Sequence, residues 1–277
     1  EMIALSFTVL AMRYLAIMLP TGSWRDFITG VSMVALFLSV VSALFVRDRP
    51  SYLEDTQPAL QFSDILEQLK FFVVDKKMWS NGVFSGLIFA CLSCFVAQWG
   101  PGFLSHATTM NLDDAASMCT VLTMGLIVSC PVVSWVLPKI ENIKLVLSLS
   151  ALVTSICLSL VVMFPMMDQW YMTVCLFTTG FFAVSYLVPF TIAHFYVRPG
   201  SKSTAIGFTN MLSTTFGPLL SLLIGVMIDS HHDLANGEYT LIDYQYGMNI
   251  LPMCMFIAAF VCFFVPTTHR SGVSDDI

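Results

Sequence analysis

Residues 79–104 read WSNGVFSGLIFACLSCFVAQWGPGFL, an apolar stretch that contains no charged side chain. An α-helix rises about 1.5 Å per residue, so a stretch of this length can cross the ~30 Å hydrocarbon core of a lipid bilayer. Its few polar residues are separated by Phe, Leu, Ile, Val and Ala. The stretch therefore predicts a membrane-spanning helix, and the rest of the chain repeats the pattern.

Seven further apolar stretches of similar length occur along the chain. They lie at residues 1–19, 24–45, 113–137, 144–164, 169–195, 205–228 and 247–266. Hydrophobic residues make up 57% of the chain and charged residues 11%, whereas a soluble domain carries about 25% charged residues. The composition excludes a soluble globular domain. It predicts an all-α polytopic membrane protein with about eight transmembrane helices.

The positions of the basic residues predict the side of the membrane on which each loop lies. Ten of the twelve Lys and Arg residues follow even-numbered stretches, namely Arg47, Arg49, Lys70, Lys76, Lys77, Lys139, Lys144, Arg198, Lys202 and Arg270. Lys and Arg are retained on the cytoplasmic side during membrane insertion. We therefore expect a multi-pass protein with a cytoplasmic C-terminus, in a plasma membrane such as the bacterial inner membrane.

The longest hydrophilic stretch, residues 46–78, contains an amphipathic segment at residues 62–73. Its apolar residues follow the i, i+3, i+4, i+7 spacing of one helix face, and they are Phe62, Ile65, Leu66, Leu69, Phe72 and Val73. This spacing predicts a helix that lies on the inner membrane face. Residues 46–78 thus form a cytoplasmic linker, and residues 267–277 form a cytoplasmic tail.

The cysteine and histidine residues do not predict a metal site. All eight cysteines lie within predicted spans, where a thiol behaves as a small apolar group. Cys91 and Cys94 form a C-x-x-C pattern, but a metal or redox role needs polar access and partner ligands. The adjacent His231 and His232 lie in a polar loop without Cys or carboxylates at regular ligand spacing. We expect neither a metal nor a cofactor.

Three segments resemble the major facilitator superfamily of membrane transporters. Residues 22–27 (GSWRDF), which run through a helix to Arg47-Asp48-Arg49-Pro50, resemble the region of the fifth and sixth helices. Residues 196–210 (YVRPGSKSTAIGFTN) resemble the connection between the tenth and eleventh helices, and residues 216–229 continue the match. Residues 98–104 (QWGPGFL) resemble the outer end of the seventh helix.

The resemblance implies a twelve-helix bundle of two halves, of which this chain holds helices five to twelve. Residues 1–45 would then be the last two helices of the N-terminal half, and residues 79–266 the six-helix C-terminal half. The chain begins at Glu1 without an initiator Met, and we expect helices one to four to belong to the same protein and to lie upstream. They would be partners of the chain, together with the lipid bilayer and a small-molecule substrate. We expect no nucleic-acid partner.

One departure from the family concerns its loop signature, Gly-x-x-x-Asp-Arg-x-Gly-Arg-Arg. The repeat of this signature after the eighth helix would fall at residues 134–144, which read SWVLPKIENIK. The basic character is present and the aspartate is absent. The resemblance therefore does not extend, in this half, to the aspartate of the charge relay that the family places at its inner gate.

Polar and aromatic residues within the spans are candidates for solute contact, because such residues usually face a cavity or a partner helix. The candidates are Asn81, Gln98, Trp99, Thr123, Phe182, Tyr186, Asn210 and Thr214. Phe182 and Tyr186 share a helix face at i, i+4 spacing, as do Asn210 and Thr214. Candidates for a helix break or gate are Gly100, Pro101, Gly102 and Pro189.

Each candidate also has a structural interpretation. Gln98 and Asn210 can hydrogen-bond to another helix, and Trp99 can anchor its helix at the membrane interface. Phe182 and Tyr186 can pack in the core or against lipid. Arg13 is the only charge deep within a predicted span, and it either snorkels to the interface or contacts an anion or partner group in the cavity.

The set of amide, hydroxyl and aromatic groups suits a neutral or zwitterionic substrate. No carboxylate lies in the middle of a predicted span, and residues 79–104 contain no Lys or Arg. Organophosphate exchangers of the superfamily typically place a cation in the seventh helix, so the resemblance disfavours a phosphate ester. We expect a secondary active transporter, such as a symporter, that moves an amino acid, a nucleoside or a similar metabolite. A proton gradient and a sodium gradient are the two candidates for the coupling ion.

Two alternatives use the same fold. The chain is then either a non-transporting receptor or sensor, or an inactive transporter fragment. An enzyme is not expected, because the sequence has no nucleophile–base pair, no H-E-x-x-H motif and no phosphate-binding Gly loop.

Overall fold

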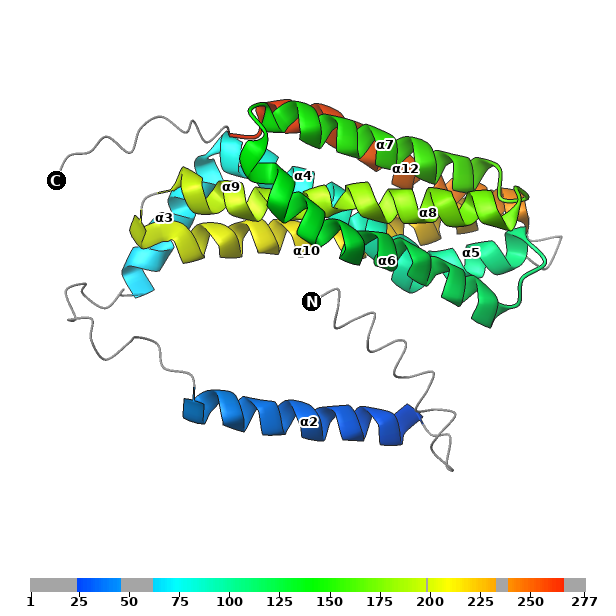
Figure 1. Ribbon diagram of the computed structural model, residues 1–277, viewed down its shortest axis with the longest axis horizontal. Helices are drawn as coiled ribbons and strands as arrows, with labels where there is room; N and C mark the ends of the chain where they lie inside the picture. Colours follow the sequence, from blue (N-terminus) through cyan, green and yellow to red (C-terminus); the bar gives the residue numbers. More distant parts are fainter. Residues whose placement is uncertain (1–23, 46–61, 198, 233–238, 267–277) are drawn as a thin grey trace. The chain divides into compact units, whose positions relative to one another are not determined.

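The computed structural model describes residues 24–45, 62–197, 199–232 and 239–266 (Figure 1). The chain divides into two compact units, residues 1–61 and residues 62–277. Within the described residues, seven helices are long and apolar enough to cross a membrane. The all-α polytopic membrane fold is confirmed. The predicted span at residues 1–19, with Arg13, lies outside the described residues.

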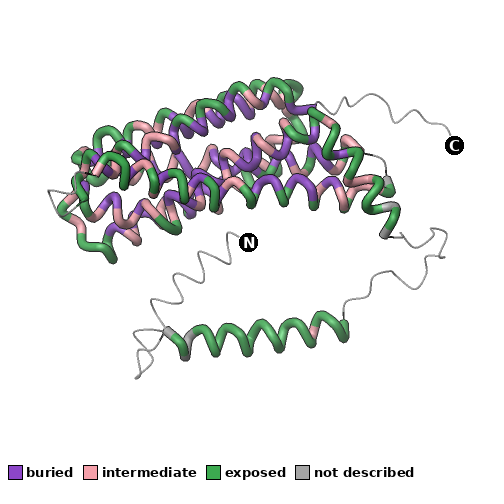
Figure 2. The backbone as a smooth tube through the Cα atoms, turned by 180° about the vertical axis from the view of Figure 1, so that it is seen from behind, coloured by how far each residue is buried: buried purple, intermediate pink, exposed green. Residues whose placement is uncertain are grey.

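The described part of the first unit is one long helix, α2 (Trp24–Phe45). Residues 28–45 of α2 are exposed apart from the half-buried Val41 (Figure 2). The hydroxyl groups of Thr29 and Ser32 donate to carbonyl oxygens four residues earlier, at 2.9 Å and 2.8 Å. These bonds satisfy polar groups inside the helix itself, which an apolar surrounding requires.

The second unit consists of α3 (Phe62–Val74) followed by six spans, several of which change helix type along their length. The spans are α4 (Lys76–Ser93) with η1 (Cys94–Trp99) and α5 (Gly100–Ala107); α6 (Leu112–Val136) with η2 (Leu137–Lys139); α7 (Ile143–Met163); α8 (Gln169–Ala183) with η3 (Val184–Leu187) and α9 (Val188–Tyr196); η4 (Pro199–Ser201) with α10 (Lys202–His231); and α11 (Leu241–Met248) with α12 (Ile250–Val261) and η5 (Cys262–Phe264).

The amphipathic segment predicted at residues 62–73 is confirmed as helix α3. Leu69 and Phe72 pack against Ala205 and Phe208 of α10, while Phe71 remains 64% exposed. Contact of α3 with α10 and α4 joins it to the six-span unit, so the boundary between the two units falls inside the predicted linker of residues 46–78.

Helices α4 and α10 run parallel and are in close contact, with α4 the more deeply buried of the two. Along the pair, Gly82 faces Leu212, Gly86 faces Phe216, and Gly225 faces Trp99. Glycine lets the two backbones approach closely, which is the usual way for helices to associate inside a membrane.

Helices α6 and α8 make an even closer crossing, with one glycine on each side. A Cβ atom at Gly125 would overlap the carbonyl oxygen of Phe177, and one at Gly180 would overlap the carbonyl oxygen of Leu122. Both obstacles are backbone atoms, so side-chain movement cannot relieve them. This crossing therefore depends on glycine at both positions.

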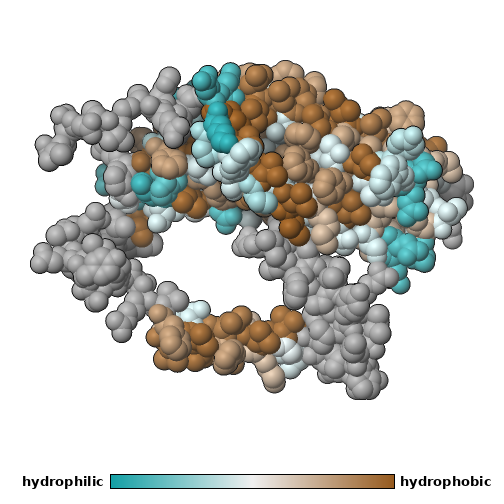
Figure 3. All heavy atoms as spheres, in the orientation of Figure 1, coloured by the Kyte–Doolittle hydropathy of each residue, from teal (hydrophilic) through white to brown (hydrophobic). Residues whose placement is uncertain are grey.

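On the face seen in Figure 3, hydrophilic residues gather toward the two ends of the six-span unit, and the surface between them is mostly apolar. Because successive spans are antiparallel, the starts of α4, α7 and α10 and the end of α6 lie at the same end of the bundle. We call it the basic end, since it carries Lys76, Lys77, Lys139, Lys144 and Lys202.

Candidate solute-binding site

The first site element is the π-helix η1, which interrupts the span that contains Gln98 and Trp99. Pro101 has no N–H to donate to the carbonyl four residues earlier, and the Gly100 N–H donates instead to the carbonyl of Phe95, five residues earlier. The helix thus continues through the predicted break as α5. Single π-helical turns inside long helices occur frequently at functional sites.

Gln98 and Trp99 leave this π-helix in different environments. The Gln98 side chain is exposed, and its amide makes no hydrogen bond within the described residues. Trp99 is half-buried, and its Nε1–H donates to Ser221 Oγ of α10 at 3.2 Å. The absence of a side chain at Gly225, whose Cβ would lie 3.4 Å from the indole ring, makes room for it. Trp99 therefore ties two helices together, and Gln98 presents an exposed amide that is unbonded among the described residues.

Asn210 and Thr214 lie on an exposed face of α10. The Thr214 hydroxyl donates to the Asn210 carbonyl at 2.9 Å and lies 3.2 Å from the Met211 carbonyl, so its proton is used within the helix. The Asn210 amide makes no hydrogen bond within the described residues. Ser221, beside Trp99, is about 16 Å from Asn210 along the helix axis at 1.5 Å per residue. The structure does not bring Gln98 and Asn210 together at one depth.

Asn81 is fully buried between α4 and α9. Its Nδ2 donates to the carbonyl oxygen of Pro189 at 2.9 Å, and its Oδ1 is buried without a hydrogen-bond partner in the described part of the chain. The predicted break at Pro189 takes the form of the 3₁₀ turn η3, which precedes α9. Asn81 thus bonds to a backbone group on the second interrupted span.

Sequence reasoning missed a polar contact line beside Asn81. Ser85 Oγ donates to the Tyr186 carbonyl at 2.8 Å, and Ser213 Oγ lies 2.7 Å from Ser85 Oγ. We call Asn81, Ser85 and Ser213, with the carbonyls of Tyr186 and Pro189, the polar seam. It joins α4, α10 and the η3–α9 break. The signal in the sequence was the i, i+4 pair of small polar residues at 81 and 85.

Removing one hydroxyl from the polar seam should weaken the bundle moderately. We expect Ser213→Ala to lower the free energy of unfolding by about 1 kcal/mol, because a buried hydroxyl that contacts Ser85 Oγ at 2.7 Å and the Thr209 carbonyl of its own helix at 2.9 Å is lost. In a unit of this size that corresponds to a melting temperature lower by roughly 2–4 °C. Thermal unfolding in detergent measures it. Ser230→Ala is the matched control, because Ser230 is exposed and donates only to Met227 of its own helix; an equal shift in both variants would contradict the seam.

The aromatic candidates of α8 and η3 do not form one surface. Phe182 is half-buried and contacts Phe181 edge-on, with ring centroids 5.4 Å apart. Tyr186 is 8% exposed and packs on Phe89 of α4, also at 5.4 Å. The 3₁₀ turn between them changes the angular spacing from that of a regular α-helix. Thr123 is buried in α6, near the glycine crossing with α8.

The residues that replace the family's loop signature form a local contact at the basic end. The Lys139 ammonium lies 3.3 Å from the centroid of the Trp135 ring, one helical turn earlier. This cation–π arrangement satisfies a lysine without a carboxylate. The contact of Lys139 at this position is thus with an aromatic ring.

A histidine cluster lies at the opposite end, where α10 meets α11. Its members are His231, His232, Thr240 and Asp243. The Nδ1 atoms of His231 and His232 lie 2.7 Å and 3.4 Å from the Asp243 carboxylate, which also accepts bonds from the Thr240 amide and hydroxyl. Nearby, a hydrogen bond to Asp229 raises the pKa of Tyr239. No group of three His, Cys, Asp or Glu suited to a metal occurs within the described residues.

The fold and these polar groups define a class, the polytopic helical membrane proteins with polar groups inside their spans. The family model of the Major Facilitator Superfamily matches residues 2–222. The chain therefore belongs to the Major Facilitator Superfamily, and the predicted resemblance is confirmed. No curated protein sequence matches the chain.

Among solved structures, the chain resembles a bacterial homologue of the human lysosomal transporter Spinster, crystallised in an inward-facing and unoccupied conformation. The TM-score is 0.57 and the sequence identity 13%, over 87% of this chain and 58% of that chain. The likeness at this identity concerns the fold. The chain spans somewhat more than half of the length of that transporter.

Proposed function

We propose that this chain belongs to a secondary active transporter that moves a small polar organic metabolite by alternating access. The observation that carries the proposal is the Gln98 amide. It is exposed on an interrupted span, and it makes no hydrogen bond within the described residues. An amide offers both a donor and an acceptor to a solute.

The chemistry of the spans supports a neutral or zwitterionic substrate, such as an amino acid or a nucleoside. The lysines of the six spans, Lys76, Lys77, Lys139, Lys144 and Lys202, lie at the basic end, in the first or last turn of a helix. The candidate side chains deeper in the bundle are amides, hydroxyls and aromatic rings. We propose that a proton or sodium gradient drives transport, with the basic end facing the cytoplasm of a plasma membrane, as the distribution of Lys and Arg favours.

Loss of the Gln98 amide should reduce transport without loss of folded protein. We expect Gln98→Ala to lower the initial rate of substrate uptake by roughly two- to tenfold, the range for one lost neutral hydrogen bond. The measurement is counterflow into proteoliposomes that hold the protein purified from its native membrane, with an amino-acid and nucleoside panel. Gln169→Ala is the matched control, because Gln169 is an exposed glutamine at the start of α8.

The same assay separates the proposal from its competitors. Flux of a phosphate ester, with none of an amino acid or nucleoside, would reject the substrate class. Tight binding of a solute without any counterflow would favour a receptor. Equal flux in Gln98→Ala and Gln169→Ala would remove Gln98 from the site.

A further inference from the structure

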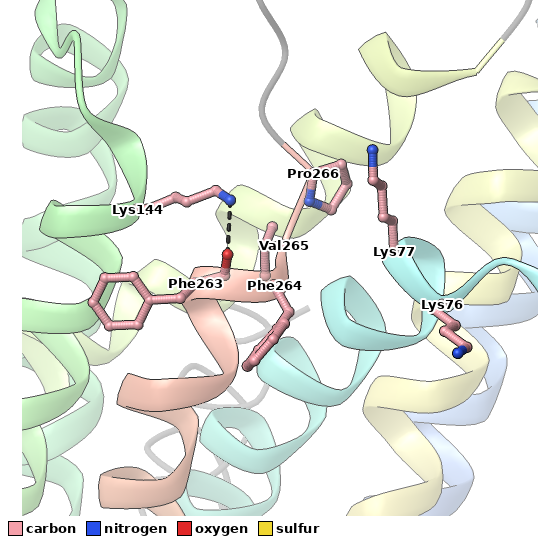
Figure 4. A pocket seen from close by; sticks show the side chains of 7 residues that line it. All are labelled: Lys76, Lys77, Lys144, Phe263, Phe264, Val265 and Pro266. Atoms are coloured by element: carbon pink, nitrogen blue, oxygen red, sulfur yellow. Dashed lines mark hydrogen bonds between the residues drawn. The ribbon is translucent and has the colours of Figure 1, made fainter.

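A cavity of about 320 Å³ lies at the basic end, separate from the candidate solute site. It is lined by Lys76, Lys77, Lys144 and residues 263–266 (Figure 4). The lysines come from the first turns of α4 and α7, and residues 263–266 follow α12. This size is at the lower end of the range of small-molecule sites, about 300–1,000 Å³.

Two hydrogen bonds hold the walls of this cavity in place. The Lys144 ammonium donates to the Phe263 carbonyl at 2.7 Å, and the Ser80 hydroxyl donates to the Phe264 carbonyl at 2.8 Å, with the Lys77 carbonyl of its own helix as a second acceptor at 2.9 Å. The end of the last span is thus tied to α7 on one side and to α4 on the other. Val265 and Pro266 are buried between them. The cavity therefore belongs to the packed bundle.

The lining residues that the structure describes carry positive charge and include no carboxylate. The nearest acid in sequence, Asp75, accepts bonds from the Lys77 amide and from the Tyr196 hydroxyl. No ion pair of Lys76, Lys77 or Lys144 with an acid is found among the described residues. The positive ends of the α4 and α7 dipoles lie at the same place, because both helices begin there. The cavity is suited to an anion.

The surroundings favour an anion that is attached to an apolar group. Phe263 and Phe264 are 52% and 73% exposed beside the cavity. Lys76 opens one apolar span and Phe264 closes another. The ends of apolar spans are expected at the level of the lipid headgroups, and we infer the same level for the cavity. A free anion would gain nothing from the two phenyl rings, whereas the acyl chains of a lipid would cover them.

We propose that this cavity binds the phosphate of an anionic phospholipid headgroup, with the acyl chains lying against Phe263 and Phe264. Lys77 and Lys144 are its principal cationic contacts, since Figure 4 shows the Lys76 ammonium directed away from these two side chains. Basic cavities between membrane helices bind headgroups of this kind. The proposal needs only that the protein resides in a membrane, and it is independent of the transported solute.

The test compares lipid retention in three variants of the full chain. Protein is placed in nanodiscs of phosphatidylcholine with one-fifth phosphatidylglycerol, and retained lipids are counted by native mass spectrometry. We expect Lys77→Gln to lower the apparent affinity for phosphatidylglycerol about fivefold, and Lys77→Gln/Lys144→Gln about thirtyfold. Lys139→Gln should retain the wild-type affinity, because Lys139 lies at the same end but outside the cavity.

The single variant keeps the test valid if the double variant is unstable, because Lys77 makes no side-chain hydrogen bond within the described residues. Equal retention in Lys77→Gln and Lys139→Gln would overturn the proposal. Stabilisation by inorganic phosphate equal to that by the lipid would assign the cavity to free anions instead. A shortened chain that ends at Pro266 tests the acidic tail, which carries Asp275 and Asp276. If only this shortened chain retained phosphatidylglycerol, the tail and not a lipid would occupy the cavity of the full chain, and the proposal would be overturned.

Discussion

Replacement of Gly180 by alanine is expected to destabilise the six-span unit by about 3 kcal/mol, the upper part of the range for overpacking a core. The added methyl group would overlap the carbonyl oxygen of Leu122 in α6. Because this obstacle is backbone, the strain is relieved only if α6 and α8 move apart. Gly125 on α6 packs equally closely against the backbone of Phe177 in α8. Moving the two helices apart therefore also weakens this second close contact.

The measurement is the melting temperature and the monodisperse fraction after purification in a mild detergent. Gly207→Ala is the matched control, because a Cβ atom at Gly207 of α10 meets nothing within 4 Å. Alanine is the better helix former, so the control should be neutral or slightly stabilising. A Gly180→Ala protein as stable as Gly207→Ala would show that the crossing tolerates a wider spacing than the structure has.

Replacement of Asn81 by alanine is expected to cost about 1–2 kcal/mol of stability. The Pro189 carbonyl would lose its hydrogen bond in a fully buried position, and a small cavity would be left. Removal of Oδ1, which has no hydrogen-bond partner among the residues that the structure describes, offsets part of this cost. Contacts between membrane helices are in general worth less than their buried position suggests, which keeps the estimate below that for Gly180.

Asn210→Ala is the natural comparison for Asn81→Ala, since the two asparagines differ in burial. We expect Asn210→Ala to change the melting temperature little and to reduce counterflow, because the exposed amide makes no hydrogen bond within the described residues. Asn81→Ala should lower the melting temperature more than Asn210→Ala does. If the order were reversed, with Asn210 stabilising and Asn81 neutral, the assignment of Asn81 to the polar seam would be wrong.

The spans were predictable from the sequence because hydrophobicity and length decide them. The predicted stretch at residues 144–164 corresponds to α7 (Ile143–Met163), and the one at residues 169–195 to the span that ends at Tyr196. The last span begins at Leu241, earlier than the predicted residue 247. A capping box formed by Thr240 and Asp243 starts the helix within a polar segment that a hydrophobicity pattern does not include.

The internal geometry of the spans was not predictable to the same degree. Gly100, Pro101 and Pro189 marked the places where two helices change, but the sequence did not distinguish a break from a π-helix or a 3₁₀ turn. That choice depends on which carbonyls find other donors, such as Ser85 for Tyr186. Such donors come from distant helices, so the answer requires tertiary structure.

The sequence was sufficient to predict which residues are candidates for solute contact. It was not sufficient to predict how these residues are arranged in space. Gln98, Asn210 and Thr214 are exposed, as solute contacts need to be, whereas Asn81 and Trp99 make bonds between helices. Whether two candidate residues on different helices lie at the same depth depends on how the helices are aligned along their axes. The alignment of α4 with α10 is set by glycine contacts, which cannot be predicted from the sequence of either helix alone. The prediction for Arg13 concerns a residue outside the described part.

The π-helix η1 also has a consequence for how this span tolerates changes in length. A π-turn holds one residue more than the α-helical turn it replaces, and it is equivalent to an insertion that the helix has absorbed. Deletion of Ala97 would restore regular α-helical bonding and rotate α4 against α5 by about 100°. The glycine face of α4 toward α10 and the packing of α5 on α6 could then not both be kept. The extra residue changes the rotation between α4 and α5 about the helix axis. It thereby directs the glycine face of α4 toward α10 and the packing face of α5 toward α6.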